Sequence, residues 1–291
     1  MPRVLCWLLT DPPDLDKRVI HVRDTWARRC DVTLFMSSME NKTFPTIGLR
    51  VPPGRGHIAK KAKAAWKYIY EHHLNDADFF IKADPDTYVI VENLKHCLSS
   101  RDPKRAEFYG HQFYPSDWEF NADTRIKKSV YMSGGPGFVL SREAVRLLVT
   151  KAINSDPKCL QDGEAEDMKA AKCLLSVGAE PVDTRDQLGR ERYMIFPPYV
   201  HLKGHYADWY KKGGAHGAVE VCRMKSTTAD LKIYNYIFYL DWALKIRWQT
   251  KGVVLTATAS SIPTPSELTT DVLLQIQIIQ PLLDMPMKTY Y

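Results

Sequence analysis

Residues 79–90, FFIKADPDTYVI, give the clearest indication of how this chain folds. An apolar run typical of a buried strand is followed directly by Asp84 and Asp86, with Pro85 between them. Proline restricts its own backbone and favours an extended residue before it, so this loop is held in place. Two neighbouring carboxylates attract a cation, and their oxygens suit Mg²⁺ or Mn²⁺ completed by substrate phosphates. The alternative is a capped turn, in which both aspartates bond backbone amides.

The sequence on both sides of this stretch alternates between strand and helix patterns. Strands are predicted at 3–10, 31–38, 78–83 and 107–113, and a glycine turn at 131–141. Helical spacing is found at 15–30, 57–73, 91–100, 141–152 and 164–177. This order predicts an α/β fold with a mainly parallel sheet covered by helices, in which ligands bind at the carboxyl ends of strands.

Composition and charge set the class of protein. The 291 residues are 45% hydrophobic and 25% charged, as in globular proteins with one large domain or two small ones. The net charge of +6 is modest and more typical of a solvated basic face than of an anion-binding surface, and we predict no nucleic-acid partner. No run of 18 apolar residues occurs, so the sequence predicts no membrane anchor in the chain as given.

Cysteine usage indicates the compartment. The chain has six cysteines and no CxxC pair, which favours the scattered disulfides of a secretory-pathway enzyme over a zinc module. Buried free thiols in a cytosolic protein are the alternative. The sequence Asn41-Lys42-Thr43 is a glycosylation sequon, a motif that also occurs often by chance.

Several motifs together resemble those of a known enzyme family. ADPDTYV at 83–89, YMSGGPGFVLS at 131–141 and EAEDM at 164–168 look like glycosyltransferases of the GT-A fold, specifically the core 1 β1,3-galactosyltransferases. VLCWLLT, HVRDTWARRC, LFMSS, YEHHLNDADFF, DTRDQLGRE and KSTT add to the resemblance in the family's order. It implies a GT-A catalytic domain over residues 1–250, followed by an unmatched tail at 251–291.

The resemblance also implies roles for residues near the glycine turn and the two aspartates. Asp84 and Asp86 would carry the family's D-x-D motif, which binds Mn²⁺ and through it the diphosphate of UDP-galactose. Gly134 and Gly135 match the glycine turn under the sugar, although a plain hairpin turn is equally natural.

Two basic residues match positions near the nucleotide in this family. They are Arg23 and Lys61, and each also fits a solvated helix charge.

The segment 162–178 predicts a helix closed by Gly178. Glu166 and Asp167 lie in its first turn, where acids suit the helix dipole. In an inverting transfer a carboxylate must take the proton from the acceptor hydroxyl as its oxygen attacks the sugar. The resemblance implies that Asp167 is this general base and that Glu166 orients it.

The chain departs from the family pattern near residues 213–222. Gly213 and Gly214 stand where the family has an adjacent cysteine pair, and Cys222 stands where it has a metal-binding histidine. His201, His205 and His216 lie nearby, and three outcomes are open: a histidine, His205 first among them, takes over as the third metal ligand, Cys222 binds the metal poorly, or the site holds no catalytic metal. We predict one of the first two.

The function implied is that of an inverting galactosyltransferase of the Golgi lumen. It would extend O-linked N-acetylgalactosamine on glycoproteins, using Mn²⁺ and UDP-galactose. Family members are membrane-anchored, and the resemblance also allows a homodimer. A fringe-like β1,3-N-acetylglucosaminyltransferase and a non-catalytic, chaperone-like relative are the alternatives.

We predict two disulfides. Cys6–Cys30 would join a strand to the end of the following helix, and Cys159–Cys173 would close a short loop at the helix that carries Asp167.

Overall fold

A computed structural model describes residues 1–114, 130–186, 191–196, 206–208 and 210. The chain divides into two compact units, Met1–Met224 and Lys225–Tyr291, and every described residue belongs to the first. The domain boundary predicted at residue 250 and the tail at 251–291 therefore lie outside the described residues.

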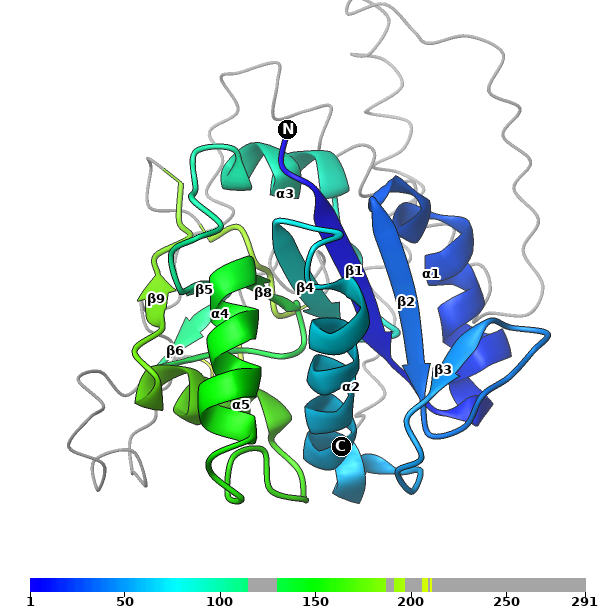
Figure 1. Cartoon of the computed structure of the whole chain (residues 1–291). Coiled ribbons are helices and arrows are strands. Elements are labelled where there is room, and N and C mark those ends of the chain that lie inside the picture. Colours follow the sequence, from blue (N-terminus) through cyan, green and yellow to red (C-terminus); the bar gives the residue numbers. More distant parts are fainter. Residues whose placement is uncertain (115–129, 187–190, 197–205, 209, 211–291) are drawn as a thin grey trace, which may run out of the picture. The chain divides into compact units, whose positions relative to one another are not determined.

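One large sheet forms the centre of the first unit (Figure 1). Its described strands lie in the order β3-β2-β1-β4-β8-β5-β9. Their bounds are Val4–Leu9 for β1, Val32–Ser37 for β2, Thr46–Gly48 for β3, Phe79–Ala83 for β4, Glu107–Tyr109 for β5, Phe138–Ser141 for β8 and Glu180–Val182 for β9. The four strands β3, β2, β1 and β4 run parallel to one another. Strand β8 is antiparallel to both of its neighbours, β4 and β5, and β9 is parallel to β5. The predicted α/β fold with a mainly parallel mixed sheet is confirmed.

Helices cover both faces of the sheet (Figure 1). Helices α2 (Ile58–His73), α4 (Arg142–Leu147) and α5 (Glu166–Ser176) pack on one face, and α1 (Ile20–Asp24) and α3 (Val91–Leu98) on the other. Successive side chains of a strand point to opposite faces, so β1 places Leu5 and Trp7 in the first core and Cys6 in the second. A strand buried on both faces needs a continuous apolar run, which β1 and β4 have apart from Lys82.

The helix predicted over 15–30 is not continuous. The segment Leu15–Val19 is a π-helical turn, α1 follows, and Trp26–Arg29 is a separate 3-10 turn. The break is at Thr25, whose backbone leaves the helical region (φ −115°, ψ −107°) and whose hydroxyl donates to the carbonyl of His21. Just after the break, the Trp26 indole is buried and donates to the carbonyl of Thr87.

The strand predicted over 107–113 is also divided. Strand β5 pairs within the large sheet, whereas β6 (Gln112–Phe113) pairs with β7 (Tyr131–Met132) in a separate two-stranded sheet. Gly110 lies between the two pieces. A Cβ there would be 2.9 Å from the Cβ of Met132, so only glycine permits this close approach.

The segment 131–141, predicted only as a glycine turn, also contains strands β7 and β8, and β8 lies between β4 and β5 in the large sheet. The other predicted helices agree with the structure to within about two residues at their ends. The helix predicted over 141–152 is α4 continued by a π-helical turn at Leu148–Ile153. Helix α5 ends at Ser176, and Gly178 follows with φ +83°, the left-handed conformation expected of a closing glycine. The short edge strands β3 and β9 were not predicted, because three residues carry too little periodic signal.

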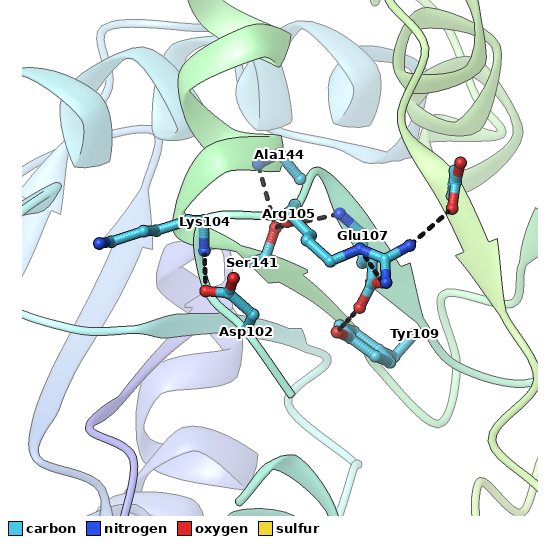
Figure 2. Close-up of polar contacts among 8 residues, drawn as sticks. Asp102, Lys104, Arg105, Glu107, Tyr109, Ser141 and Ala144 are labelled. Atoms are coloured by element: carbon cyan, nitrogen blue, oxygen red, sulfur yellow. Dashed lines mark hydrogen bonds and ion pairs between the residues drawn. The ribbon is translucent and has the colours of Figure 1, made fainter. Parts of the chain in front are cut away.

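Ser141 lies in the part of the sheet beyond β4 and links β8, β5 and the start of α4. Figure 2 shows its hydrogen bonds. Its hydroxyl oxygen accepts from the backbone N–H of Ala144 at the start of α4 and from that of Glu107 on β5, both at 3.1 Å. The same hydroxyl donates to the carbonyl of Arg105 at 2.6 Å. Glu107, which is buried, in turn accepts from the hydroxyl of Tyr109 and pairs with Arg105.

Both predicted disulfides are confirmed. Cys6 on β1 bonds Cys30 after the 3-10 turn, and Cys159 bonds Cys173 in α5. No helix in the described part of the chain is both long enough and apolar enough to cross a bilayer.

Candidate active site

The two aspartates of the opening stretch follow β4 at the carboxyl edge of the sheet, as predicted. The Asp84 side chain is 28% exposed, and Asp86 is exposed. The loop is fixed by Thr87, whose hydroxyl accepts from the N–H of Asp84 at 3.0 Å and donates to the carbonyl of Gly135 at 2.7 Å. The aspartate loop is therefore bonded to the glycine turn that the sequence placed some 45 residues away.

Lys82 lies beneath the loop and was missed by the sequence analysis. Its side chain is 1% exposed, and its Nζ is 2.6 Å from Asp84 Oδ1 and 2.5 Å from Glu166 Oε1. Burial disfavours the ammonium form, but the two carboxylates outweigh it and raise the pKa of Lys82. The ammonium ion therefore links the end of β4 to the start of α5. A lone lysine inside an apolar strand was the signal that could have found it.

The start of α5 brings Glu166 and Asp167 to the same place. Ala165, just before them, has a left-handed backbone (φ +57°), which is unusual for a residue with a Cβ. Glu166 is buried, and its Oε2 has no hydrogen-bond partner among the described residues. Burial, opposed by Lys82, raises the pKa of Glu166 to about 7.

Asp167 reaches the glycine turn from the other side. Its Oδ2 accepts from the N–H of Gly134 at 2.9 Å, and its Oδ1 accepts from the N–H of Met168 at 2.8 Å. Tyr131 lies near it: burial, and then the charge of Asp167, raise the pKa of Tyr131 to about 12. The Asp167 carboxylate is half-buried and held by backbone amides, so its position is well defined.

The glycine turn 134–137 is shaped by what surrounds it. A Cβ on Gly134 would lie 3.3 Å from both Asp167 Oδ2 and Glu166 Oε1. Gly137 has φ +86°, and a Cβ there would lie 2.7 Å from the carbonyl of Lys82. Gly135 faces open space. Gly134 and Gly137 therefore let the turn approach β4 and α5 closely, while Gly135 leaves room above it.

The other predicted site residues have different surroundings. The Lys61 ammonium is buried and bonds both carboxylate oxygens of Asp11 at 2.8 Å. Because Asp11 follows β1, which is parallel to β4, this pair lies at the same edge of the sheet as Asp84. Arg23 instead pairs with Asp24 on α1 and lies over the ring of Phe44.

Three other positions from the sequence analysis cannot be placed. His205, Cys222 and the glycine pair at 213–214 lie outside the described residues.

Carboxylate oxygens are suitable ligands for a hard divalent cation, but the described residues supply few of them at this place. Among those residues no group of three or more His, Cys, Asp or Glu side chains is arranged to hold a metal ion. Oδ1 of Asp84 is occupied by Lys82, which leaves Oδ2 to meet a cation. Such a site suits an ion that completes its coordination with phosphate oxygens and water.

Comparisons with known proteins agree with this geometry. Residues 15–183 match the sequence profile of the family described as Fringe-like. The chain is 37% identical over 212 residues to glycoprotein-N-acetylgalactosamine 3-beta-galactosyltransferase 1 of Xenopus laevis, an alignment that covers 72% of this chain and 56% of the relative. It is 27% identical over 198 residues to a beta-1,3-glucosyltransferase of Mus musculus, covering 64% and 38%.

A third relative is more distant. Chondroitin sulfate synthase 3 of Mus musculus is 22% identical over 244 residues, covering 79% of this chain and 27% of the relative. The chain thus spans about half or less of the length of these relatives. The profile match and the sheet topology together support the GT-A fold that the motifs predicted.

Proposed function

Because this chain belongs to the Fringe-like family, we propose that it is an inverting β1,3-glycosyltransferase that moves galactose from UDP-galactose to O-linked N-acetylgalactosamine on glycoproteins. The proposed sugar and acceptor agree with the name of the galactosyltransferase to which the chain is 37% identical. The observation that carries the proposal is the joining of Asp84 and Glu166 by the Lys82 ammonium, next to Asp167. A donor-binding loop and a candidate base are thus held side by side.

In this proposal Asp167 is the general base. It takes the proton of the acceptor hydroxyl while that oxygen attacks the anomeric carbon, and the bond from this carbon to the UDP oxygen breaks on the opposite face. The N–H of Gly134 keeps one carboxylate oxygen of Asp167 oriented at 2.9 Å. Glu166 positions Asp167 through its place at the start of α5 and its ion pair with Lys82.

Asp84 and Asp86 would hold a divalent cation, proposed to be Mn²⁺, which neutralises charge on the departing diphosphate. Oδ1 of Asp84 stays with Lys82, so Asp84 would bind through Oδ2 alone. Gly135, with open space around it, is proposed to lie beneath the sugar. Lys61 and Arg23 are proposed to serve the nucleotide, and His205 to be a further metal ligand.

Two alternatives differ in sugar or in activity. The Fringe-like profile also fits an N-acetylglucosaminyltransferase, but the 37% identity to a galactosyltransferase favours galactose. A non-catalytic, chaperone-like relative would not need the aspartate loop to be linked to α5, the helix that carries the proposed base. The pair of disulfides supports passage through an oxidising compartment, and we propose the Golgi lumen, with membrane attachment and a homodimer as in the family.

The proposal is tested with a panel of UDP-sugars and a peptide bearing O-linked N-acetylgalactosamine, with and without Mn²⁺. We expect transfer from UDP-galactose alone, a β-linked product by NMR, and loss of transfer after chelation. Asp167→Asn, which keeps an oxygen for the N–H of Gly134, should lower kcat by about 10²- to 10⁴-fold while UDP still binds. Asp16→Asn, at an exposed position, is the matched control.

Two outcomes would contradict the proposal. Transfer of another sugar would replace the donor assignment. Full activity of Asp167→Asn would remove Asp167 as the base.

A further inference from the structure

The turn between β2 and the edge strand β3 carries a motif that the proposed function does not use. Residues 38–45 form this connection, and Asn41-Lys42-Thr43 is the only Asn-x-Ser/Thr sequence in the chain. The Lys42 and Thr43 side chains are exposed, and Asn41 is half-buried. The folded chain therefore presents the whole motif at its surface.

Hydrogen bonds fix which end of the Asn41 amide is engaged. The oxygen Oδ1 accepts from the N–H of Thr43 at 3.0 Å, from the hydroxyl of Thr43 at 2.7 Å and from the N–H of Phe44 at 3.3 Å. Three donors converge on this atom, so it must be the oxygen rather than the nitrogen. The nitrogen Nδ2 donates to no described residue, so a substituent on Nδ2 would break none of these bonds.

The conformation of the turn is held by contacts that do not involve Nδ2 of Asn41. Phe44 is buried and packs edge-on against Phe35 of β2, with ring centroids 5.1 Å apart. The N–H of Asn41 donates to the hydroxyl of Thr46 at 2.8 Å, and this hydroxyl donates to the carbonyl of Met39. A bulky group on Nδ2 would leave this apolar and backbone support intact.

The turn is also remote from the aspartate loop. In the described sheet β3 is separated from β4 by β2 and β1, which corresponds to about 14 Å of sheet. A substituent at Asn41 would therefore lie near the edge strand β3, three strand spacings from the aspartate loop. It would also cover the end of the sheet at β3, where an uncovered strand invites pairing with another chain.

The disulfides supply an independent observation about the compartment. Cys6–Cys30 and Cys159–Cys173 form and persist in oxidising compartments such as the lumen of the endoplasmic reticulum. Glycosylation of Asn-x-Ser/Thr sequences takes place in the same secretory pathway.

We propose that Asn41 is a site of N-glycosylation. The co-reactant is an oligosaccharide linked to a lipid through a diphosphate. Nδ2 of Asn41 forms a bond to the anomeric carbon of the first sugar, and the bond from that carbon to the diphosphate oxygen breaks. The lipid diphosphate leaves with the electron pair, and one proton of Nδ2 passes to a base of the transferring enzyme. The proposal goes beyond the proposed function and rests only on passage through the secretory pathway.

The test uses the full chain produced behind a cleavable secretion signal in animal cells. Cell-associated and secreted protein are both treated with peptide-N-glycosidase, and the peptide containing Asn41 is examined by mass spectrometry. We expect one glycan, removed by the enzyme with conversion of the asparagine to aspartate. N41D keeps the oxygen acceptor of the turn and should lose the whole gel shift, as should Thr43→Ala.

Thr43→Ser, which keeps both the hydroxyl and the motif, is the matched control and should retain the shift. An unmodified Asn41 in both pools overturns the proposal, whether or not the protein transfers galactose. A glycan at Asn41 on a protein without transferase activity would uphold this site and defeat the proposed function instead.

Discussion

At the scale of single residues, Lys82 has the most consequences. A buried ammonium ion is costly unless it is paired, and here two carboxylates pair with it. Asp84 stands in the loop and Glu166 in the helix, so one side chain couples two segments that are 82 residues apart. Removal of one partner lowers the free energy of unfolding by more than the whole cluster adds to it, because the remaining groups keep a buried charge without a counter-charge.

We predict that Lys82→Met lowers the free energy of unfolding by about 3 kcal/mol, since Asp84 and Glu166 would face each other without a counter-charge. The loss should be smaller at pH 6 than at pH 8, because Glu166 can take a proton to relieve the repulsion. Urea denaturation at both pH values measures it. Lys60→Met, at an exposed position of the same chain, is the control.

Partial recovery in Lys82→Met with Glu166→Gln would identify the unpaired carboxylate as the cause. A change below about 1 kcal/mol at pH 8 would contradict the coupling.

At the scale of elements, the junction of β5, β8 and α4 depends on one hydroxyl. Ser141 is the N-cap of α4 and the last residue of β8, and its hydroxyl satisfies two N–H groups and one carbonyl (Figure 2). Buried backbone groups that lose their partner carry a desolvation cost. The junction therefore holds together the part of the sheet beyond β4.

We predict that Ser141→Ala lowers the free energy of unfolding by about 2 kcal/mol, because the cap of α4 is lost and the N–H of Glu107 loses its acceptor. Binding of UDP should change little, since the proposed site is built from β4, the glycine turn and α5. Thermal denaturation and UDP titration measure the two effects. Ser155→Ala, at an exposed position, is the control, and an equal effect of both changes would rule out a special role for Ser141.

At the scale of the whole molecule, two buried glutamates set the response to pH. Burial raises the pKa of Glu166 and of Glu191 to about 7. The unfolded chain has glutamate pKa values near 4.5. Between these limits the folded state binds more protons than the unfolded state, so stability falls as pH rises.

We predict that the free energy of unfolding decreases between pH 5 and pH 8. Glu191→Gln should flatten this slope, because a neutral amide has no proton to lose. Urea midpoints at pH 5, 6.5 and 8 test it. Glu164→Gln, at an exposed position, is the control. A stability that rises over this range would show that the glutamates are not the controlling groups.

Much of the architecture followed from local pattern. The apolar runs of β1, β2 and β4, the helical spacing of α2 and α5, and the closing glycine after α5 were all predicted, because each depends on neighbouring residues. Both disulfides were also predicted, and both are present. The break at Thr25 and the division at Gly110 were not predicted. Beside the first, the Trp26 indole bonds the distant carbonyl of Thr87, and at the second, Gly110 approaches the distant Met132.

Local pattern was enough to place carboxylates after a buried strand, acids at the start of a later helix and a glycine turn between them. The meeting of these three segments, through Lys82, Thr87 and the N–H of Gly134, is seen only in the folded chain. The physical reason is that strand and helix periods are properties of short segments. The pairing of a buried charge is a property of the packed core, where β4, β8 and α5 come together.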